Sequence, residues 1–163
     1  MELLGRYDIS VVIGTIEELN YLLEEGKKID LENPMTNNIK ENIELRKRIR
    51  EFCKKYGTIV LLNTERYYLT DGFSEFYIGF LDNKFKVFKY VLPGLVSVGI
   101  STYKEKEKRF KGILIATMVM SVVNKEIGTL EKEAELQDII NSIKNVSPKK
   151  INELSDIEYG FSR

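Results

Sequence analysis

Three turn signals divide residues 58–103 into short apolar or alternating runs. The signals are the pairs Asp71-Gly72, Asp82-Asn83 and Pro93-Gly94, whose residue types suit the tight bends of β-turns. Strands that are joined by such short turns pair with one another in antiparallel fashion. We therefore predict an antiparallel β-meander of about four to five strands. The first run forms either two strands or one strand that bends at Asn63.

The chain before this region is typical of a strand followed by two helices. Residues 7–14 form a short apolar run that ends at a glycine, which indicates a strand. Thr15 can cap the next segment together with Glu18, three residues further on, as in a capping box. Residues 36–56 are the longest helix candidate, and Gly57 is a natural end for it. The apolar stripe of this helix consists of Ile39, Ile43, Ile49, Phe52 and Cys53.

The chain after the meander is predicted to be helical. Periodicity does not distinguish a helix from a strand in the apolar run 113–123, but flanking charges extend it to about twenty residues, which favours a helix. Residues 129–145 are amphipathic at helical spacing, and Ser147-Pro148 is typical of the start of a short last helix. Residues 155–163 are expected to form a loose tail. The fold class is therefore α+β, and residues 1–163 form a single domain in which helices pack against the meander.

Composition excludes several kinds of chemistry. The chain has no His, which removes the usual general base and the commonest zinc ligand. Cys53 is the single Cys, so neither an intrachain disulfide nor a thiolate cluster can form. Its place on an apolar stripe indicates a small hydrophobic residue rather than a nucleophile. We accordingly predict no catalytic residue, no cofactor and no metal site, and we expect a binding protein rather than an enzyme.

Charge and hydropathy constrain the surroundings of the protein. The 25 basic and 25 acidic residues cancel, so no overall field favours polyanions or membranes. The N-terminus lacks the features of a signal peptide, and the longest apolar run is too short to span a bilayer. We expect a reduced, cytoplasmic protein without a membrane partner. Abundant Lys and Glu with a single Gln fit a thermophile, and an AT-rich genome would produce the same bias.

The run 84–91 alternates lysine with aromatic and branched residues. On a strand, two lysines and two aromatic rings of this run would share one face. A sheet that binds single-stranded nucleic acid presents such a mixture, because rings stack on bases and lysines contact phosphates. Ordinary hairpins also carry lysines on their solvent face, and we favour this simpler interpretation. The residues that a nucleic-acid surface would use are Lys84, Lys86, Phe88, Tyr90, Arg66, Tyr68, Lys108 and Arg109.

Two further groups of charged residues carry weaker signals. Lys108 and Arg109 belong to the stretch 104–111, whose interspersed glutamates are typical of a solvated face, although such a stretch can also contact phosphates. Several carboxylates could bind Mg²⁺ if the fold brought them together. They are Glu65, Asp71, Glu75 and Asp82. Two of them stand in turns, where Asp is favoured because its side chain bonds to the turn backbone.

The end of the meander and the helix after it point to an interaction between chains. Ser97, Gly99 and Ser101 form a face without bulk, which lets another backbone or a flat ligand approach closely. The helix at 113–123 is apolar nearly all round, so it needs cover on several sides. The chain's own helices are the simpler source of that cover, and a second copy is the alternative. Our leading hypothesis is a non-enzymatic binding domain, as a homodimer or with another protein partner. A nucleic-acid-binding protein ranks second, and a metal-dependent hydrolase or nuclease ranks third.

Overall fold

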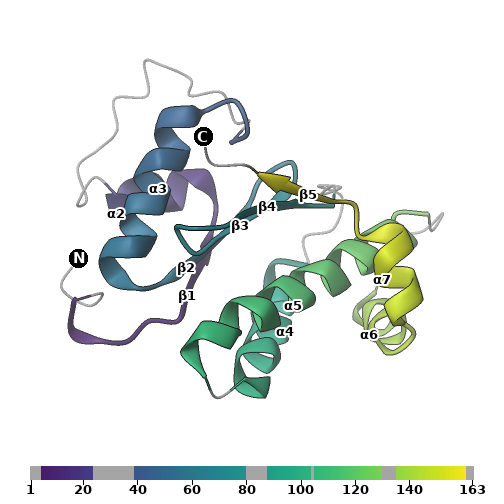
Figure 1. Ribbon diagram of the computed structural model, residues 1–163. Helices are drawn as coiled ribbons and strands as arrows, with labels where there is room; N and C mark the ends of the chain where they lie inside the picture. The colour runs from purple at the N-terminus through teal and green to yellow at the C-terminus, as the bar shows by residue number, and fades with distance from the viewer. Residues whose placement is uncertain (1–4, 24–38, 80–87, 104, 130–134, 161–163) are drawn as a thin grey trace. The chain divides into compact units, whose positions relative to one another are not determined.

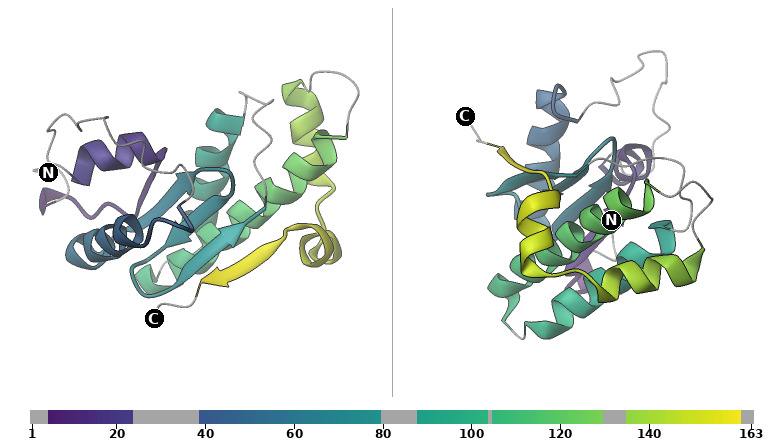
Figure 2. Two further views of the ribbon diagram at one scale, coloured as in Figure 1. Left: turned by 90° about the horizontal axis from the view of Figure 1, so that it is seen from above. Right: turned by 90° about the vertical axis from the view of Figure 1, so that its right-hand side faces the viewer.

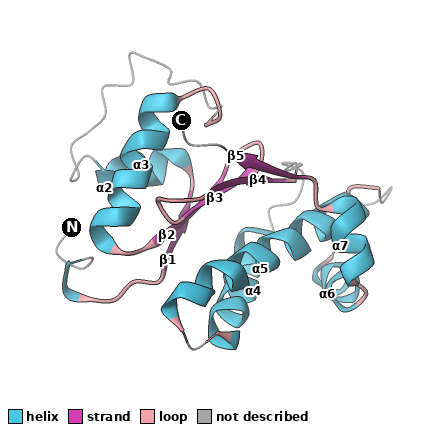
Figure 3. Cartoon of the chain, in the orientation of Figure 1, coloured by secondary structure: helices cyan, strands magenta, loops and turns pink. Residues whose placement is uncertain are grey.

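The computed structural model describes residues 5–23, 39–79, 88–103, 105–129 and 135–160 (Figure 1). These residues form two compact units. The first unit takes in the described residues up to Tyr77 together with Tyr159 and Gly160, and the second takes in those from Ile78 to Glu158. Figure 3 distinguishes the helices from the strands.

Five strands form one sheet of mixed pairing (Figure 1). In their order across the sheet, they are β1 (Val11–Gly14), β2 (Ile59–Asn63), β3 (Tyr67–Thr70), β4 (Glu75–Ile78) and β5 (Ile157–Gly160). Val12 of β1 lies opposite Val60 of the parallel strand β2, and two helices between these strands make the long connection that parallel pairing needs. β2 pairs antiparallel with β3. The protein thus combines helices with a sheet as predicted, but the sheet is not purely antiparallel.

The predicted meander is present in its first part. The run 58–70 forms two strands, β2 and β3, rather than one bent strand. The Asp71-Gly72 turn follows as predicted, and the Asp71 carboxylate accepts hydrogen bonds from the backbone N–H groups of Phe73 at 2.9 Å and Ser74 at 2.7 Å. The second predicted turn, at Asp82-Asn83, lies outside the described residues.

Residues 88–102 form a helix, so the strands predicted on either side of Pro93-Gly94 are wrong there. This helix, α4 (Phe88–Thr102), packs along α5 (Lys106–Ile127), and the two lie side by side in both views of Figure 2. Leu92 and Val96 fall on one face of α4 and are buried. Leu92 and Val96 are four positions apart, which is helical spacing, whereas Val98, which the predicted strand would place with Val96, is exposed. Packing against a second helix selects the helix.

Two glycines face each other where α4 meets α5. A Cβ atom on Gly99 would overlap the carbonyl group of Gly112, and a Cβ atom on Gly112 would overlap the carbonyl group of Gly99. The two backbones therefore touch with no side chain between them. Close approach of another backbone at Gly99 is expected from the sequence, and it occurs between two helices rather than in a sheet.

In the first unit, the start of the first helix and the end of the second helix lie at the predicted signals. Before α2 (Ile16–Leu23), the Thr15 N–H donates to Glu18 Oε2 at 2.9 Å, and the Glu18 N–H donates to Thr15 Oγ1 at 3.3 Å. This is the predicted capping box. α3 (Ile43–Tyr56) ends at Gly57, whose φ of 59° is left-handed and suits a glycine. The predicted helix 36–56 is too long at its start, because residues 39–42 are not helical and Asn42 caps the helix by accepting a hydrogen bond from the Leu45 N–H at 3.0 Å.

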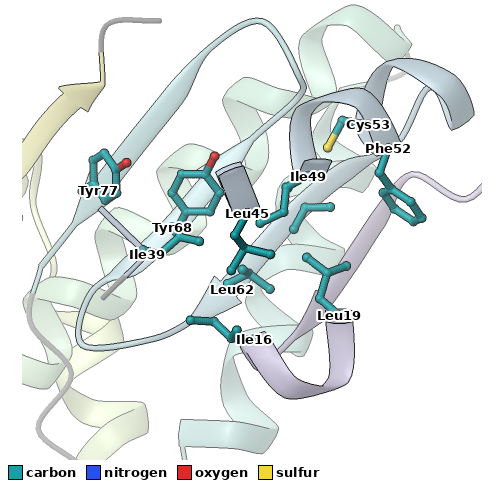
Figure 4. Close-up of a cluster of buried hydrophobic side chains, with 11 residues drawn as sticks. Ile16, Leu19, Ile39, Leu45, Ile49, Phe52, Cys53, Leu62, Tyr68 and Tyr77 are labelled. Carbon is teal, nitrogen blue, oxygen red and sulfur yellow. The ribbon is translucent and has the colours of Figure 1, made fainter. Parts of the chain in front are cut away.

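The core of the first unit lies between these two helices and the sheet (Figure 4). It consists of Ile16, Leu19, Ile39, Leu45, Ile49, Phe52, Cys53, Val60, Leu62, Tyr68 and Tyr77. The predicted stripe of α3 is confirmed at Ile49, Phe52 and Cys53. Ile43 is exposed instead, because it is the first residue of the helix and Leu45 occupies the buried position.

The C-terminal helices of the second unit also follow the sequence signals. The apolar run 113–123 lies within α5 and is helical as predicted. α6 (Leu136–Lys144) follows, and α7 (Pro148–Leu154) begins after Ser147, whose Oγ accepts a hydrogen bond from the Lys150 N–H at 3.3 Å. Among the helices of the described residues, none combines the length and the apolar character that crossing a bilayer requires.

The C-terminal residues 157–160 form β5, within the segment for which the sequence predicts a loose tail. Two hydrogen bonds within the second unit hold the chain just before this strand. The Gly79 N–H donates to the Asp156 carbonyl at 2.9 Å, and Ser121 Oγ donates to the Ser155 carbonyl at 2.9 Å. The residues that each bond joins lie far apart in the chain, so local sequence does not predict these contacts.

Candidate functional site

A buried carboxylate is the centre of the most polar part of the first unit. The Glu75 side chain, on β4, is 0% exposed. Arg46 and Arg50 reach it from α3, with nitrogen–oxygen distances of 3.4 Å and 3.6 Å. The Tyr68 hydroxyl donates to Glu75 Oε1 at 3.0 Å, and Arg46 also donates to the Tyr77 hydroxyl at 3.2 Å. We call these five residues the Glu75 cluster.

The Glu75 cluster joins α3 to the sheet rather than offering a reactive group. Burial, and then the charge of Glu75, raise the pKa of Tyr68 far above its usual value, so its hydroxyl stays protonated and remains a donor. A Cβ atom on Gly160 of β5 would lie 3.1 Å from Glu75 Oε2, so the neighbouring strand packs directly against the carboxylate. A carboxylate enclosed in this way has its lone pairs occupied within the protein.

The predicted carboxylates do not gather around a common point. Asp71 accepts hydrogen bonds within its turn, and Glu75 belongs to the Glu75 cluster. Glu65 is exposed, and Asp82 lies outside the described residues. Across the part of the chain that the structure describes, no three acidic or Cys side chains approach one another closely enough to hold a metal ion. The hydrolase hypothesis therefore has no described site to support it.

Cys53 is a buried core residue. It lies in the core cluster of the first unit, and burial together with the charge of Asp71 raises its thiol pKa to about 12. At neutral pH the side chain is therefore a neutral thiol, since the nucleophilic form is the thiolate. This agrees with its interpretation as a small hydrophobic residue.

The predicted nucleic-acid surface is not assembled as expected. Lys84 and Lys86 lie outside the described residues. Phe88 and Tyr90 belong to α4, so the strand that would place them on one face is wrong at these two positions. Tyr90 itself is exposed.

The remaining predicted residues are divided between the two units. Tyr68 is buried in the Glu75 cluster, and Arg66 donates to the Tyr77 carbonyl at 3.2 Å in the first unit. In the second unit, the exposed Lys108 pairs with Glu105 at 2.8 Å, while Arg109 is half-buried on α5. The Lys108 pair is the solvated arrangement that alternating charges indicate.

From Tyr90 onward, the side chains that the structure describes on the outer face of α4 are exposed and carry no charge. Its members follow helical spacing, and we call them the α4 face: Tyr90, Pro93, Gly94, Ser97, Val98 and Ser101. Ser97 and Ser101 donate to carbonyl groups of their own helix at 2.8 Å and 2.9 Å. A partner can therefore cover this face without leaving those hydroxyls unpaired. The spacing of the six residues can be seen in the sequence, but it places them on one face only if the segment is a helix.

No protein-family model matches the chain, and the search of curated proteins finds no sequence that matches it.

Proposed function

We propose that the protein is a non-enzymatic binding domain that forms a homodimer through the α4 face. The observation that carries this proposal is an exposed helix face without charge in a chain of which 31% is charged. Val98 stands within this face and is 62% exposed. Exposed apolar surface of this kind favours association, because covering it removes it from water.

A second copy of the same chain is the partner that suits this face. A twofold dimer brings the same patch of both copies together, so any charged residue at its centre would meet its own like charge. The sequence between Lys89 and Lys104 has no charged residue. Gly94 and Ser97 add little bulk, which lets the two helices approach closely.

The interface must extend beyond α4. The 15 residues of this helix give a face about 22 Å long and about 10 Å wide. A stable interface buries about 800 Å² on each partner, which is more than this face alone provides. Ile115 of α5 is 39% exposed and follows Gly112 by about one turn, so it can add apolar area to an interface formed by α4.

Light scattering coupled to size-exclusion chromatography tests the proposal. The unmodified protein should elute with twice the 18.9 kDa mass of one chain. Val98→Glu should elute as a monomer, because it places two like charges at the centre of the interface. Ile43→Glu is the matched control, since Ile43 is also an exposed aliphatic residue on a helix, and it should leave the dimer intact.

Two outcomes would contradict the proposal. One is a monomeric mass for the unmodified protein at a concentration of about 100 μM, well above the dissociation constants of typical specific dimers. The other is a dimer that persists in Val98→Glu.

A further inference from the structure

Positive charge is concentrated on one helix of a chain whose net charge is zero. α3 carries six cations against the two carboxylates Glu44 and Glu51, an excess of four positive charges. The cations are Arg46, Lys47, Arg48, Arg50, Lys54 and Lys55. Two of them complement the negative end of the helix dipole in the last turn, but the other four stand elsewhere on the helix.

Five of the six cations divide into an inner and an outer group, and the sixth, Arg48, is half-buried. Arg46 and Arg50 face the single carboxylate of Glu75, so even the inner side of α3 keeps an excess of one positive charge. Lys47, Lys54 and Lys55 are exposed on the outer side. Because α3 lies at the surface of the first unit, a phosphate approaching its outer side would meet these lysines first.

Two aromatic rings stand beside the outer lysines. Phe73, at the tip of the turn between β3 and β4, is 72% exposed, and Lys54 Nζ lies 5.0 Å from the centre of its ring. Lys55 Nζ lies 5.1 Å from the centre of the Tyr56 ring. Lys54 and Lys55 are thus each paired with a ring, and surfaces that bind single-stranded nucleic acid combine cations with aromatic rings in this way.

The turn that carries Phe73 is packed against α3. A Cβ atom on Gly72 would lie 2.9 Å from the Arg50 carbonyl oxygen and 2.9 Å from Lys54 Cγ, so the backbone of the turn touches the helix. Gly72 has a φ of 93°, which suits glycine and closes the turn tightly. Phe73 is therefore presented to solvent from a supported position next to Lys54.

A hollow lies on the other flank of α3. Its volume is about 210 Å³, and it is lined by Leu23, Arg48, Glu51, Phe52, Lys55 and Tyr56. Phe52 and Tyr56 pack against each other with their ring centres 5.1 Å apart. The hollow offers two cations and an aromatic wall next to Lys55, so that it continues the surface around the helix from the Phe73 side.

We infer that this basic and aromatic surface of α3, defined by Lys47, Lys54, Lys55, Tyr56 and Phe73, binds single-stranded nucleic acid. The lysines contact backbone phosphates, and the exposed ring of Phe73 stacks on an unpaired base. Glu44, Glu51 and Asp71 lie on or near the same surface and weaken the attraction, so binding is strongest at low salt. The same combination of lysines and aromatic rings was considered for the run 84–91. Here the residues that supply it come from α3 and the β3–β4 turn.

The test is the fluorescence anisotropy of a labelled oligothymidylate of about 15 nucleotides, at about 50 mM and about 150 mM salt. The unmodified protein should bind, and its affinity should fall as salt rises. Lys54→Ala/Lys55→Ala should lower the affinity about tenfold at the lower salt and reduce the slope of log K against log salt by about 1.4, since each lost phosphate contact on a single strand removes about 0.7.

Two comparisons separate this surface from general electrostatic attraction. Lys125→Ala/Lys149→Ala removes the same charge from exposed lysines of α5 and α7, and it should leave the affinity nearly unchanged. Phe73→Leu should lose at least about fivefold in affinity through lost stacking, whereas Phe73→Tyr keeps an aromatic ring and should bind normally. Circular dichroism of each variant tests whether it is folded. We expect that it is, because all the altered side chains are exposed.

Three results would overturn the inference. The first is no binding of the oligothymidylate by the unmodified protein at the lower salt. The second is an equal loss in the two double-lysine variants, which would mean binding without a defined surface. The third is binding to vesicles of anionic phospholipid without binding to the oligonucleotide, which would assign the surface to a membrane.

Discussion

Each of the two units is stabilised internally by a different kind of contact. In the first, charged and hydroxyl groups are buried around Glu75, 29 positions along the chain from Arg46. In the second, α4 and α5 meet through bare backbone at Gly99 and Gly112. A buried ion pair depends on keeping both partners, because a lone buried charge is costly. A contact between glycines depends on keeping side chains out, because the interior is close-packed. The stability of the first unit should therefore fall when a buried charged group is removed. The stability of the second unit should fall when a side chain is added at the glycine contact.

The largest effect should come from removing the charge of Glu75. Glu75→Gln leaves Arg46 and Arg50 facing a neutral side chain, and we expect the free energy of unfolding to fall by about 3 kcal/mol. Urea denaturation followed by circular dichroism measures this change. Glu65→Gln, at an exposed carboxylate, is the control and should change stability by less than about 0.5 kcal/mol. Equal effects of the two substitutions would mean that the buried charge is not what holds α3 to the sheet.

A single added methyl group should have the next largest effect. Gly99→Ala places a Cβ atom against the Gly112 carbonyl group and must force α4 and α5 apart, which we expect to destabilise the protein by about 2 kcal/mol. Gly94→Ala, in the same helix, adds its Cβ atom to open space within the chain and should instead stabilise the protein by about 0.5 kcal/mol, because alanine favours helices. Both substitutions are made in the Val98→Glu background, so that the proposed contact between two copies at Gly94 does not contribute. Thermal unfolding of both variants measures the difference. Changes of the same sign would show that helix propensity, rather than the contact, decides the result.

The smallest effect should come from Glu126, whose carboxylate links three helices of the second unit through a partly exposed ion pair and a hydrogen bond. Glu126 of α5 accepts hydrogen bonds from Lys150 Nζ at 2.6 Å and from Ser142 Oγ at 2.5 Å. Burial alone would raise its pKa, but these two hydrogen bonds outweigh burial and hold the pKa below its usual value of 4.5. We expect Glu126→Gln to lower the free energy of unfolding at pH 7 by about 1 kcal/mol.

The dependence of this effect on pH has a definite sign. A carboxyl whose pKa is lower in the folded state stabilises the protein above its unfolded pKa, and the stabilisation is lost as pH falls through the folded value. The difference in stability between the unmodified protein and Glu126→Gln should therefore be constant from pH 7 to about pH 5 and shrink below about pH 4.5. A difference that stays constant down to pH 3 would contradict the assignment of a charged Glu126 to this network.

The features that could be predicted from the sequence are those that depend on neighbours within a few positions. Thr15 and Glu18 cap α2, Ser147 caps α7, and Asp71-Gly72 forms a turn, as their residue types indicate. Each involves side chains and backbone groups at most four residues apart, so local sequence contains all the information needed. The helical state of 113–123 was also predictable, because the length of the segment distinguishes helix from strand.

The candidate surfaces depended on contacts between distant residues. A lysine and aromatic mixture was predicted at 84–91, whereas the described mixture joins Lys54 to Phe73, which the packing of a turn against a helix brings together. The cations of α3 are visible in the sequence. Their division into an inner pair around Glu75 and an outer group is not, because it depends on the position of β4 beside the helix.

The sequence by itself thus determined the caps of α2 and α7, the first turn, the presence of helices with a sheet, and the buried positions Ile49, Phe52 and Cys53 of α3. Only the tertiary structure decided that residues 88–102 are a helix, that β1 lies parallel to β2, and that Glu75 is buried. In each of these cases the local pattern suited more than one conformation. The choice was made by a partner far along the chain, since burial and backbone pairing depend on which surfaces meet and not on the residues next in sequence.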